Sequence, residues 1–180
     1  MPEYTGFPVL YDTQIKSNTA AAVFQPGAIF MHKGGTGRSD TSWVQYVRLG
    51  NNGCSRGDAL MYNPATTDSW SVKKSSLTQG YSPCFVGIAG GTIASQYYGF
   101  MVIGGYCEYA YISETAVAGE NLCVSGTTEG QLTANKASNV YSGTCAVNSS
   151  AGRVTAVAIS RGACTGGALG SITLCGIWGV

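Results

Sequence analysis

The side chains that could perform acid–base or metal chemistry are few and scattered. The single histidine, His32, lies in the glycine-rich stretch HKGGTGR, with no carboxylate or cysteine near it in sequence. A catalytic triad or a zinc site needs an imidazole together with such partners. The carboxylates that could form a glycosidase pair are spread over different predicted strands and loops: Glu108, Glu114, Glu120 and Glu129. The sequence therefore predicts no catalytic residue, no metal site and no cofactor.

Cysteines are the other reactive side chains. There are seven, an odd number, and no two have C-x-x-C spacing: Cys54, Cys84, Cys107, Cys123, Cys145, Cys164 and Cys175. The N-terminal stretch MPEYTGFPVLYD has no basic region or long apolar core, so no secretory signal is expected. We therefore expect buried free thiols, with a disulfide framework as the less favoured alternative.

Two short motifs suggest binding functions. Arg56, Gly57 and Asp58 form the tripeptide RGD, but it directly precedes the strand-like run ALMY, which favours a turn. Asn148 begins the glycosylation sequon NSS, yet no secretion signal accompanies it. Neither motif is taken as functional.

Composition narrows the possible partners. The chain of 180 residues is 44% hydrophobic and only 11% charged, with a net charge of +1, whereas about 25% charged residues is typical. Nothing indicates a nucleic-acid partner, and no apolar run approaches the ~18 residues of a transmembrane helix. A weakly charged surface of Ser, Thr, Asn, Gln and Gly repels other copies little, so ordered association is favoured.

The sequence repeats itself. At an offset of 71 residues Val86 aligns with Val157, and Gly99 in GFMVIGGYC aligns with Gly170 in the C-terminal GSITLCGIWGV. At an offset of 62, GDALMY at Gly57 aligns with GENLCV. The shared glycines stand where a strand must turn or bulge. We interpret this as a duplicated β unit with about nine extra residues in the second copy.

From residue 43 onward the pattern is that of short strands. WVQYVRL suits a strand, with Gln45 and Val47 on one face and Val44, Tyr46 and Arg48 on the other. ALMYN and SWSVKK suit a hairpin, and ENLCVSGTTEGQLTA suits another with GTTEG as its loop. The only helix candidate is the weak TQIKSNTAAAVF. We predict an all-β fold in which short, glycine-punctuated antiparallel strands form a sandwich or barrel with an internal β repeat, plus an extended N-terminal arm.

We predict three parts: an N-terminal arm and two β units that pack together as one globular body. Residues 1–41 form the arm, 42–112 the first β unit and 113–180 the second. The arm is too apolar for a free tail, so we expect its large side chains to be buried against this subunit or a neighbour. The candidate partner contacts are Phe7, Val9, Leu10, Tyr11, Phe24, Ile29 and Phe30.

The order of WVQYVRLGNNGCSRGDALMYN, CFVGIAGGTIASQYYGFMVIGGYCEYAYI and AGENLCVSGTTEGQLT resembles tailed-bacteriophage capsid decoration (cement, or head-stabilising) proteins over about residues 43–133. The resemblance implies a non-enzymatic virion structural protein, made in the host cytoplasm, that binds the outer capsid surface and cements neighbouring capsomers. Its implied partners are the major capsid protein and copies of itself, as a homo-oligomer on the capsid lattice, with no nucleic acid and no membrane.

Two other readings use the same fold. A tail- or surface-associated module that binds a receptor or carbohydrate would present an exposed aromatic platform or a pocket ringed by carboxylates. A small esterase-like enzyme would need a catalytic histidine, and His32 has no partner in sequence.

Overall fold

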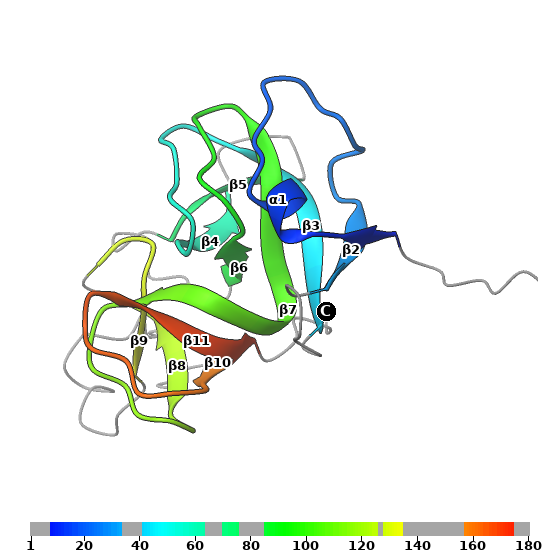
Figure 1. Ribbon diagram of the computed structural model, residues 1–180. Coiled ribbons are helices and arrows are strands. Elements are labelled where there is room, and N and C mark those ends of the chain that lie inside the picture. The colour runs from blue at the N-terminus through cyan, green and yellow to red at the C-terminus, as the bar shows by residue number, and fades with distance from the viewer. Residues whose placement is uncertain are drawn as a thin grey trace, which may run out of the picture.

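The computed structural model describes residues 8–33, 41–63, 70–75, 85–125, 128–134 and 157–174. Within them the chain forms eleven strands and one short helix (Figure 1). In chain order these are β1 (Val9–Leu10), α1 (Asp12–Ile15), β2 (Ile29–Lys33), β3 (Thr41–Leu49), β4 (Ala59–Tyr62), β5 (Ser71–Lys74), β6 (Phe85–Ala89), β7 (Tyr98–Ile112), β8 (Asn121–Val124), β9 (Leu132–Ala134), β10 (Ala158–Ser160) and β11 (Ala168–Leu174). The all-β prediction is confirmed.

The strands belong to one mixed sheet whose pairings close on themselves twice. Its order is β1-β2-β3-β5-β4-β6-β7-β11-β10-β8-β9, with β3 also paired to β7 and β7 to β9. The first closure joins β3, β5, β4, β6 and the start of β7, and we call it the first ring. The second joins the end of β7 with β9, β8, β10 and β11, and we call it the second ring. Register shifts in β3, β4 and β11 make both rings irregular rather than smooth barrels.

The repeat predicted from the amino-acid sequence also appears in the hydrogen bonds of the two rings. In the first ring the Gly57 N–H donates to the Ala89 carbonyl over 2.9 Å, and in the second the Gly119 N–H donates to the Ser160 carbonyl over 2.8 Å. Both hairpins predicted from sequence form, β4 with β5 and β8 with β9. Each ring also contains one parallel pair at the same place, β3 with β5 and β7 with β9.

Strand β7 belongs to both rings. It runs for fifteen residues, and Figure 1 shows it passing from the upper group of strands into the lower one. Gly105, at φ +81°, lies where this passage occurs, and a Cβ there would come within 2.5 Å of the Thr41 carbonyl oxygen. Glycine is therefore required at the point where β7 leaves β3.

The core is continuous across both rings. One cluster of buried side chains joins Phe30 and Phe100 of the first ring to Leu122 and Ile172 of the second. A second cluster, including Leu60 and Met101, fills the first ring. Alternating buried and exposed residues are lost in β6 because it is covered on both faces.

The helix prediction over TQIKSNTAAAVF is wrong for most of that stretch. Helix α1 covers only Asp12–Ile15, and the chain beyond it runs without helix. Thr19 instead exchanges two main-chain hydrogen bonds with Tyr98. A tertiary strand contact therefore overrides a weak local preference.

The cysteines only partly follow the expectation of free thiols. Cys54, Cys107 and Cys164 are free and buried, and burial raises the pKa of Cys54 to about 11 and that of Cys107 to about 12. Cys123 is disulfide-bonded, so the expectation is wrong there. Sequence spacing carries no information about which distant sulfur atoms meet. The remaining predicted thiols, Cys84, Cys145 and Cys175, lie outside the described residues.

Candidate functional site

The described part of the arm folds back on the first ring. Strand β2 pairs antiparallel with β3 over five residues, with Phe30 opposite Val44. Further along the chain the Thr19 N–H donates to the Tyr98 carbonyl over 3.0 Å, and the Tyr98 N–H donates back over 2.8 Å. The main-chain groups of this segment thus find partners on the first ring of the same chain.

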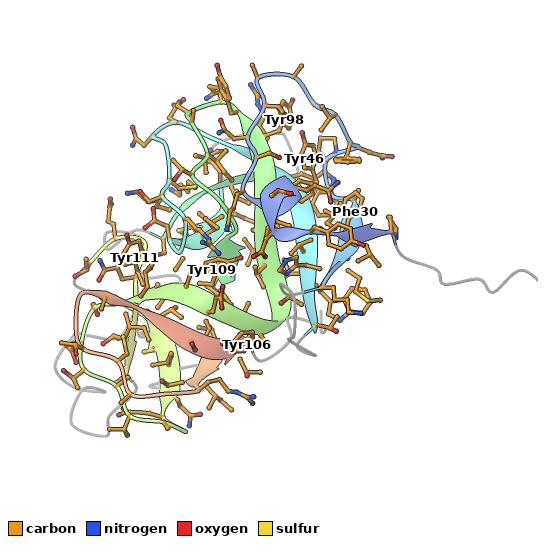
Figure 2. All side chains as sticks on the ribbon, in the orientation of Figure 1. Phe30, Tyr46, Tyr98, Tyr106, Tyr109 and Tyr111 are labelled. Carbon is orange, nitrogen blue, oxygen red and sulfur yellow. The ribbon has the colours of Figure 1, made fainter. Side chains whose placement is uncertain are left out.

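An aromatic cluster anchors the arm to the ring. Phe24 lies edge-on to Phe30 and Tyr46, with ring centroids 4.9 and 5.4 Å apart. Tyr46 stacks on Tyr98 at 5.9 Å and contacts Phe100 at 5.0 Å. Figure 2 shows Phe30, Tyr46 and Tyr98 gathered around the upper end of β3 and β7. Edge-to-face aromatic pairs add about 0.5–1.5 kcal/mol each beyond the area they bury.

The hydroxyl of Tyr46 ties the arm down as well. The Val23 N–H donates to it over 3.2 Å, and the Thr19 hydroxyl lies 3.2 Å away. The Gly27 N–H also donates to the Tyr46 carbonyl over 2.7 Å. Tyr46 of the first ring therefore contacts the arm at three residues, Thr19, Val23 and Gly27.

The candidate contact residues of the arm divide into two groups. Leu10 and Phe30 are buried in the protein's own core, and Ile29 is partly buried. Val9 is 43% exposed, Tyr11 64% and Phe24 38%. Phe7 lies outside the described residues. Only the exposed group has surface left for a partner.

Strand β1 presents the open edge of the sheet. It pairs in parallel with β2, with Val9 opposite Met31, and among the described strands it alone has a single neighbour. Every strand of the two rings has a partner on each side. We call the outer side of β1 with the exposed side chains Val9 and Tyr11 the arm edge.

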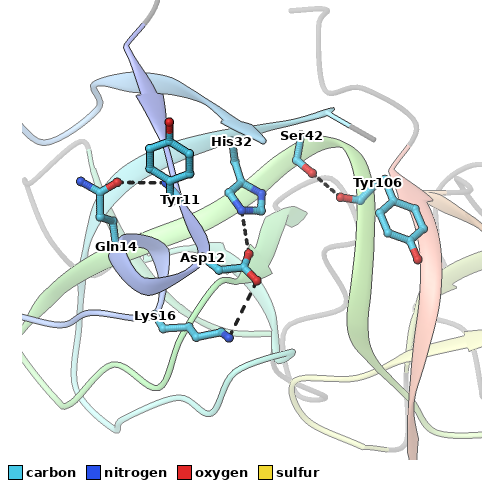
Figure 3. Close-up of polar contacts among 7 residues, drawn as sticks. All are labelled: Tyr11, Asp12, Gln14, Lys16, His32, Ser42 and Tyr106. Carbon is cyan, nitrogen blue, oxygen red and sulfur yellow. Dashed lines mark hydrogen bonds and ion pairs between the residues drawn. The ribbon is translucent and has the colours of Figure 1, made fainter. Parts of the chain in front are cut away.

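A histidine–carboxylate pair fastens α1 to the arm edge. His32 Nε2 lies 2.8 Å from Asp12 Oδ1, and Lys16 Nζ lies 4.0 Å from the other carboxylate oxygen (Figure 3). His32 therefore has a carboxylate partner in space, although none lies near it in sequence. Parallel pairing of β1 with β2 places Leu10 opposite His32, which brings the next turn of chain within reach although it is distant in sequence.

This pair is not arranged as a catalytic triad. The nearby hydroxyl of Ser42 donates to the main-chain carbonyl of Tyr106 rather than to the imidazole (Figure 3). The histidine side chain is largely buried and its Nε2 is engaged by Asp12. The pair can hold α1 in place, and no hydroxyl in the described ranges is hydrogen-bonded to the imidazole as a triad requires.

The RGD tripeptide forms a turn, as expected. Gly57 has a φ of +95°, and a carboxylate oxygen of Asp58 accepts the Ser55 N–H over 2.7 Å. The Asp58 side chain is only 8% exposed and lies 3.7 Å from the Lys74 ammonium. Burial raises the pKa of Asp58, while the Ser55 N–H and Lys74 act in the opposite direction. Such an enclosed carboxylate cannot be offered to a receptor.

The preceding residue, Arg56, is also engaged within the protein. Its guanidinium lies over the ring of Tyr109, 3.8 Å from the centroid. Tyr109 is buried, and burial raises the pKa of its hydroxyl. The contact joins the turn before β4 to strand β7, so it ties the first ring to the second.

Neither metal ligation nor membrane crossing is indicated where the structure can be read. The described ranges contain no group of three His, Cys, Asp or Glu side chains able to hold a metal ion. They likewise hold no helix whose length and apolar character would let it traverse a bilayer.

The solved structures that are similar to this chain include one phage protein. No protein-family model matches the chain, and no curated protein matches it. The crystal structure of the head fiber gp8.5 N base of bacteriophage phi29 is similar with a TM-score of 0.45 and 12% sequence identity, covering 73% of this chain and 92% of that one. Function must therefore be argued from the residues of this chain.

Proposed function

We propose that this chain is a non-enzymatic structural protein of a phage virion, which binds the outer capsid surface and cements neighbouring capsomers. The sequence resemblance over about residues 43–133 supports the class of protein. The observation that carries the mode of binding is the arm edge, the single-neighbour strand of a sheet whose other described strands are all paired on both sides.

The arm edge has the properties of a strand-addition site. An edge strand offers unpaired N–H and C=O groups to another chain, and flanking apolar side chains add contact area. Val9 and Tyr11 supply that area at exposures of 43% and 64%. A partner strand from the major capsid protein or from another copy would extend the sheet beyond β1.

Holding the edge strand in place before binding increases its affinity for a partner. A flexible tail loses conformational entropy when it binds, whereas a strand already held in place loses much less. Here β1 is held by β2, and the following α1 is fastened by Asp12 and His32. Contacts that are individually weak then add up over the many copies of a shell.

The absence of an enzymatic role in this proposal follows from how the polar side chains are used. Asp12 and His32 fasten α1, and Asp58 closes a turn beneath Lys74. Asp12, His32 and Asp58 are thus engaged in structural contacts.

The test uses a substitution that alters the edge and spares the core. Removing residues 1–41 would also remove Leu10, Ile15 and Phe30 from the core, so loss of binding could reflect unfolding. Val9→Lys instead places a charge on an exposed edge residue, a feature that blocks strand addition. The matched control is Val117→Lys, at an exposed valine of the second ring.

Binding is measured by co-sedimentation with heads assembled without this protein. We expect Val9→Lys to lower the affinity at least about tenfold, the equivalent of about 1.4 kcal/mol, while Val117→Lys binds as the wild type does. Circular dichroism and thermal unfolding confirm that both variants fold. Wild-type occupancy by folded Val9→Lys would remove the arm edge from the mechanism, and failure of the wild type to bind heads would end the proposal.

A further inference from the structure

The duplication allows the two rings to be compared position by position. At the offset of 71 residues, Tyr98 of β7 corresponds to Leu169 of β11. The pairings agree, because Tyr98 lies opposite Arg48 of β3 as Leu169 lies opposite Tyr111 of β7. Any partner of Tyr98 therefore has an expected position beside Leu169.

In the first ring the outward main-chain groups of Tyr98 are used. The Leu49 N–H donates to the Tyr97 carbonyl over 2.8 Å. The Arg48 N–H points away from β7 and donates to the Trp70 carbonyl. Antiparallel strands alternate in this way, so the N–H and C=O of Tyr98 point away from β3. Both are bonded to Thr19 of the arm.

The same alternation holds in the second ring, but the outward groups are left open. The Gly167 N–H donates to the Ile112 carbonyl over 2.7 Å. The Tyr111 N–H points away from β11 and donates to the Gly57 carbonyl. The N–H and C=O of Leu169 therefore point away from β7. Across the described residues no hydrogen bond reaches them from that side, and the Leu169 side chain is 49% exposed.

A second residue of the first ring that the arm contacts, Gly91, shows the same difference between the two rings. In the first ring a Cβ on Gly91 would come within 2.6 Å of the Lys16 carbonyl oxygen, so the arm lies directly on this glycine. The counterpart of Gly91 is Gly162, where a Cβ would meet nothing within 4 Å. The second ring keeps the glycine that close approach requires, and no described residue approaches it.

We propose that Gly162 and Leu169 form an acceptor edge for the arm edge of a second copy of this chain. The first ring shows that such a site can receive main chain of the arm, because Gly91 meets the Lys16 carbonyl and Tyr98 bonds to Thr19. Each chain has two acceptor positions and one arm, and its own arm occupies the first. The arm edge is the single-neighbour strand, so it is the segment with main-chain groups to offer.

The surface chemistry fits this pairing between copies. Val9 and Tyr11 on the arm edge and Leu169 on the acceptor edge are apolar and exposed. With a net charge of +1 over 180 residues, copies repel one another little. The contact joins two different surfaces and is therefore head-to-tail, which closes into a ring of subunits or extends into a lattice. This deepens the proposed function, on which it rests for the role of the arm edge.

Photo-crosslinking tests the contact directly. Benzoylphenylalanine replaces Leu169, and equal amounts of 15N-labelled and unlabelled protein are mixed, irradiated, reduced and digested with trypsin. Cleavage after Lys16 and Arg161 releases residues 1–16 and 162–180 as separate peptides. We expect these two peptides joined in mixed-isotope pairs, and no such product when the probe replaces Val117. Absence of the 1–16 product from the Leu169 probe, in protein that associates, overturns the proposal.

Sedimentation tests the head-to-tail arrangement. Leu169→Lys and Val9→Lys should each weaken association at least about tenfold, and Val117→Lys should not. Val9→Lys keeps its acceptor edge and Leu169→Lys keeps its arm edge, so an equimolar mixture should form dimers and nothing larger. Leu169→Ala serves if the lysine variant fails to fold, with a smaller loss expected. A wild type that is monomeric at every concentration, or association unchanged by Leu169→Lys, overturns the proposal.

The outcomes separate the two proposals. If Leu169→Lys leaves both association and head binding unchanged, the acceptor edge is wrong while the virion role stands. If copies pair through Leu169 but no heads are bound, the virion role is wrong while the contact between copies stands.

Discussion

The first ring is covered by the arm, whereas no described segment covers the corresponding surface of the second ring. The two share strand order, hairpins and matching hydrogen bonds such as Gly57 with Ala89 and Gly119 with Ser160. They differ in their contact with the N-terminal arm, which is bonded to the first ring. Thr19 bonds to Tyr98, whereas no described residue bonds to the outward main-chain groups of the equivalent Leu169. A duplicated fold can thus use one surface internally and keep its copy available for a partner.

The turns that precede β4 and β8 show the same contrast on a smaller scale. In each, a carboxylate accepts an N–H three residues earlier, from Ser55 to Asp58 over 2.7 Å and from Val117 to Glu120 over 2.9 Å. The first turn is packed against β7 of the second ring, while the second turn is exposed. The two turns therefore have the same internal hydrogen bond but different packing around them. Substituting equivalent residues in both turns can measure how much that packing contributes to stability.

The largest expected difference is between alanine substitutions at the two turn glycines. Gly57→Ala and Gly119→Ala each place a side chain at positive φ, at +95° and +82°, which costs about 1–2 kcal/mol. A Cβ on Gly57 would also collide with the Tyr109 carbonyl oxygen, whereas one on Gly119 meets nothing. We expect Gly57→Ala to lose about 1–3 kcal/mol more than Gly119→Ala, and so about 2–5 kcal/mol in total. Urea unfolding checks this, and equal losses would mean that the first turn is not packed as described.

The next effect concerns the disulfide of Cys123. Among the described cysteines it is the bonded one, and it lies in β8 of the second ring. Reduction should lower stability by about 2–4 kcal/mol. Hydrogen exchange measured with and without reductant should show faster exchange in the second ring than in the first. Uniform acceleration would indicate that the rings unfold as one unit.

A smaller effect is expected from removing two equivalent tyrosine hydroxyls. Tyr46→Phe deletes the acceptor of the Val23 N–H and the neighbour of Thr19, at about 1 kcal/mol. Its counterpart Tyr109→Phe keeps the aromatic ring that Arg56 covers. Hydrogen exchange at Thr19 and Val23 should quicken in the first variant and not in the second. Unchanged exchange in Tyr46→Phe would show that the aromatic cluster alone holds the arm.

The smallest effect is a pH dependence at Asp58. Burial raises its folded pKa above the unfolded value of about 3.9, so the folded state binds more protons between the two values. Wild-type stability should therefore fall as the pH rises through this window. Asp58→Asn removes that contribution, so its stability relative to wild type should improve with rising pH. Unfolding curves across the window check the sign, and Glu120→Gln controls for loss of the turn hydrogen bond.

The sequence predicted the arrangement within strands and turns better than the contacts between distant segments. Alternation in WVQYVRL and the spacing of turn residues indicated β3 and the two hairpins, which form as expected. These features depend on neighbours within a few residues. The pairing of Asp12 with His32 left no sign in the sequence, because it depends on β1 lying parallel to β2. The parallel pairing itself has no local signature.

The candidate site divides along the same line. Apolar side chains in the arm indicated that it is no free tail, and Leu10 and Phe30 are buried in the structure. Which arm residues remain exposed could not be foreseen, because the periodicity of so short a strand does not distinguish a side chain facing the core from one facing solvent. The arm's place on the first ring, with Thr19 beside Tyr98, was likewise set by tertiary contact.

By itself the sequence determined that the protein is all-β and internally duplicated, because residue alternation and recurring glycines report local backbone geometry directly. Only the tertiary structure decided that the strands close into two rings sharing β7, that the arm covers the first ring, and that no other described segment covers Gly162 and Leu169 of the second. The physical reason is that closure and coverage depend on long-range main-chain pairing, whose donors and acceptors are the same in every residue except proline.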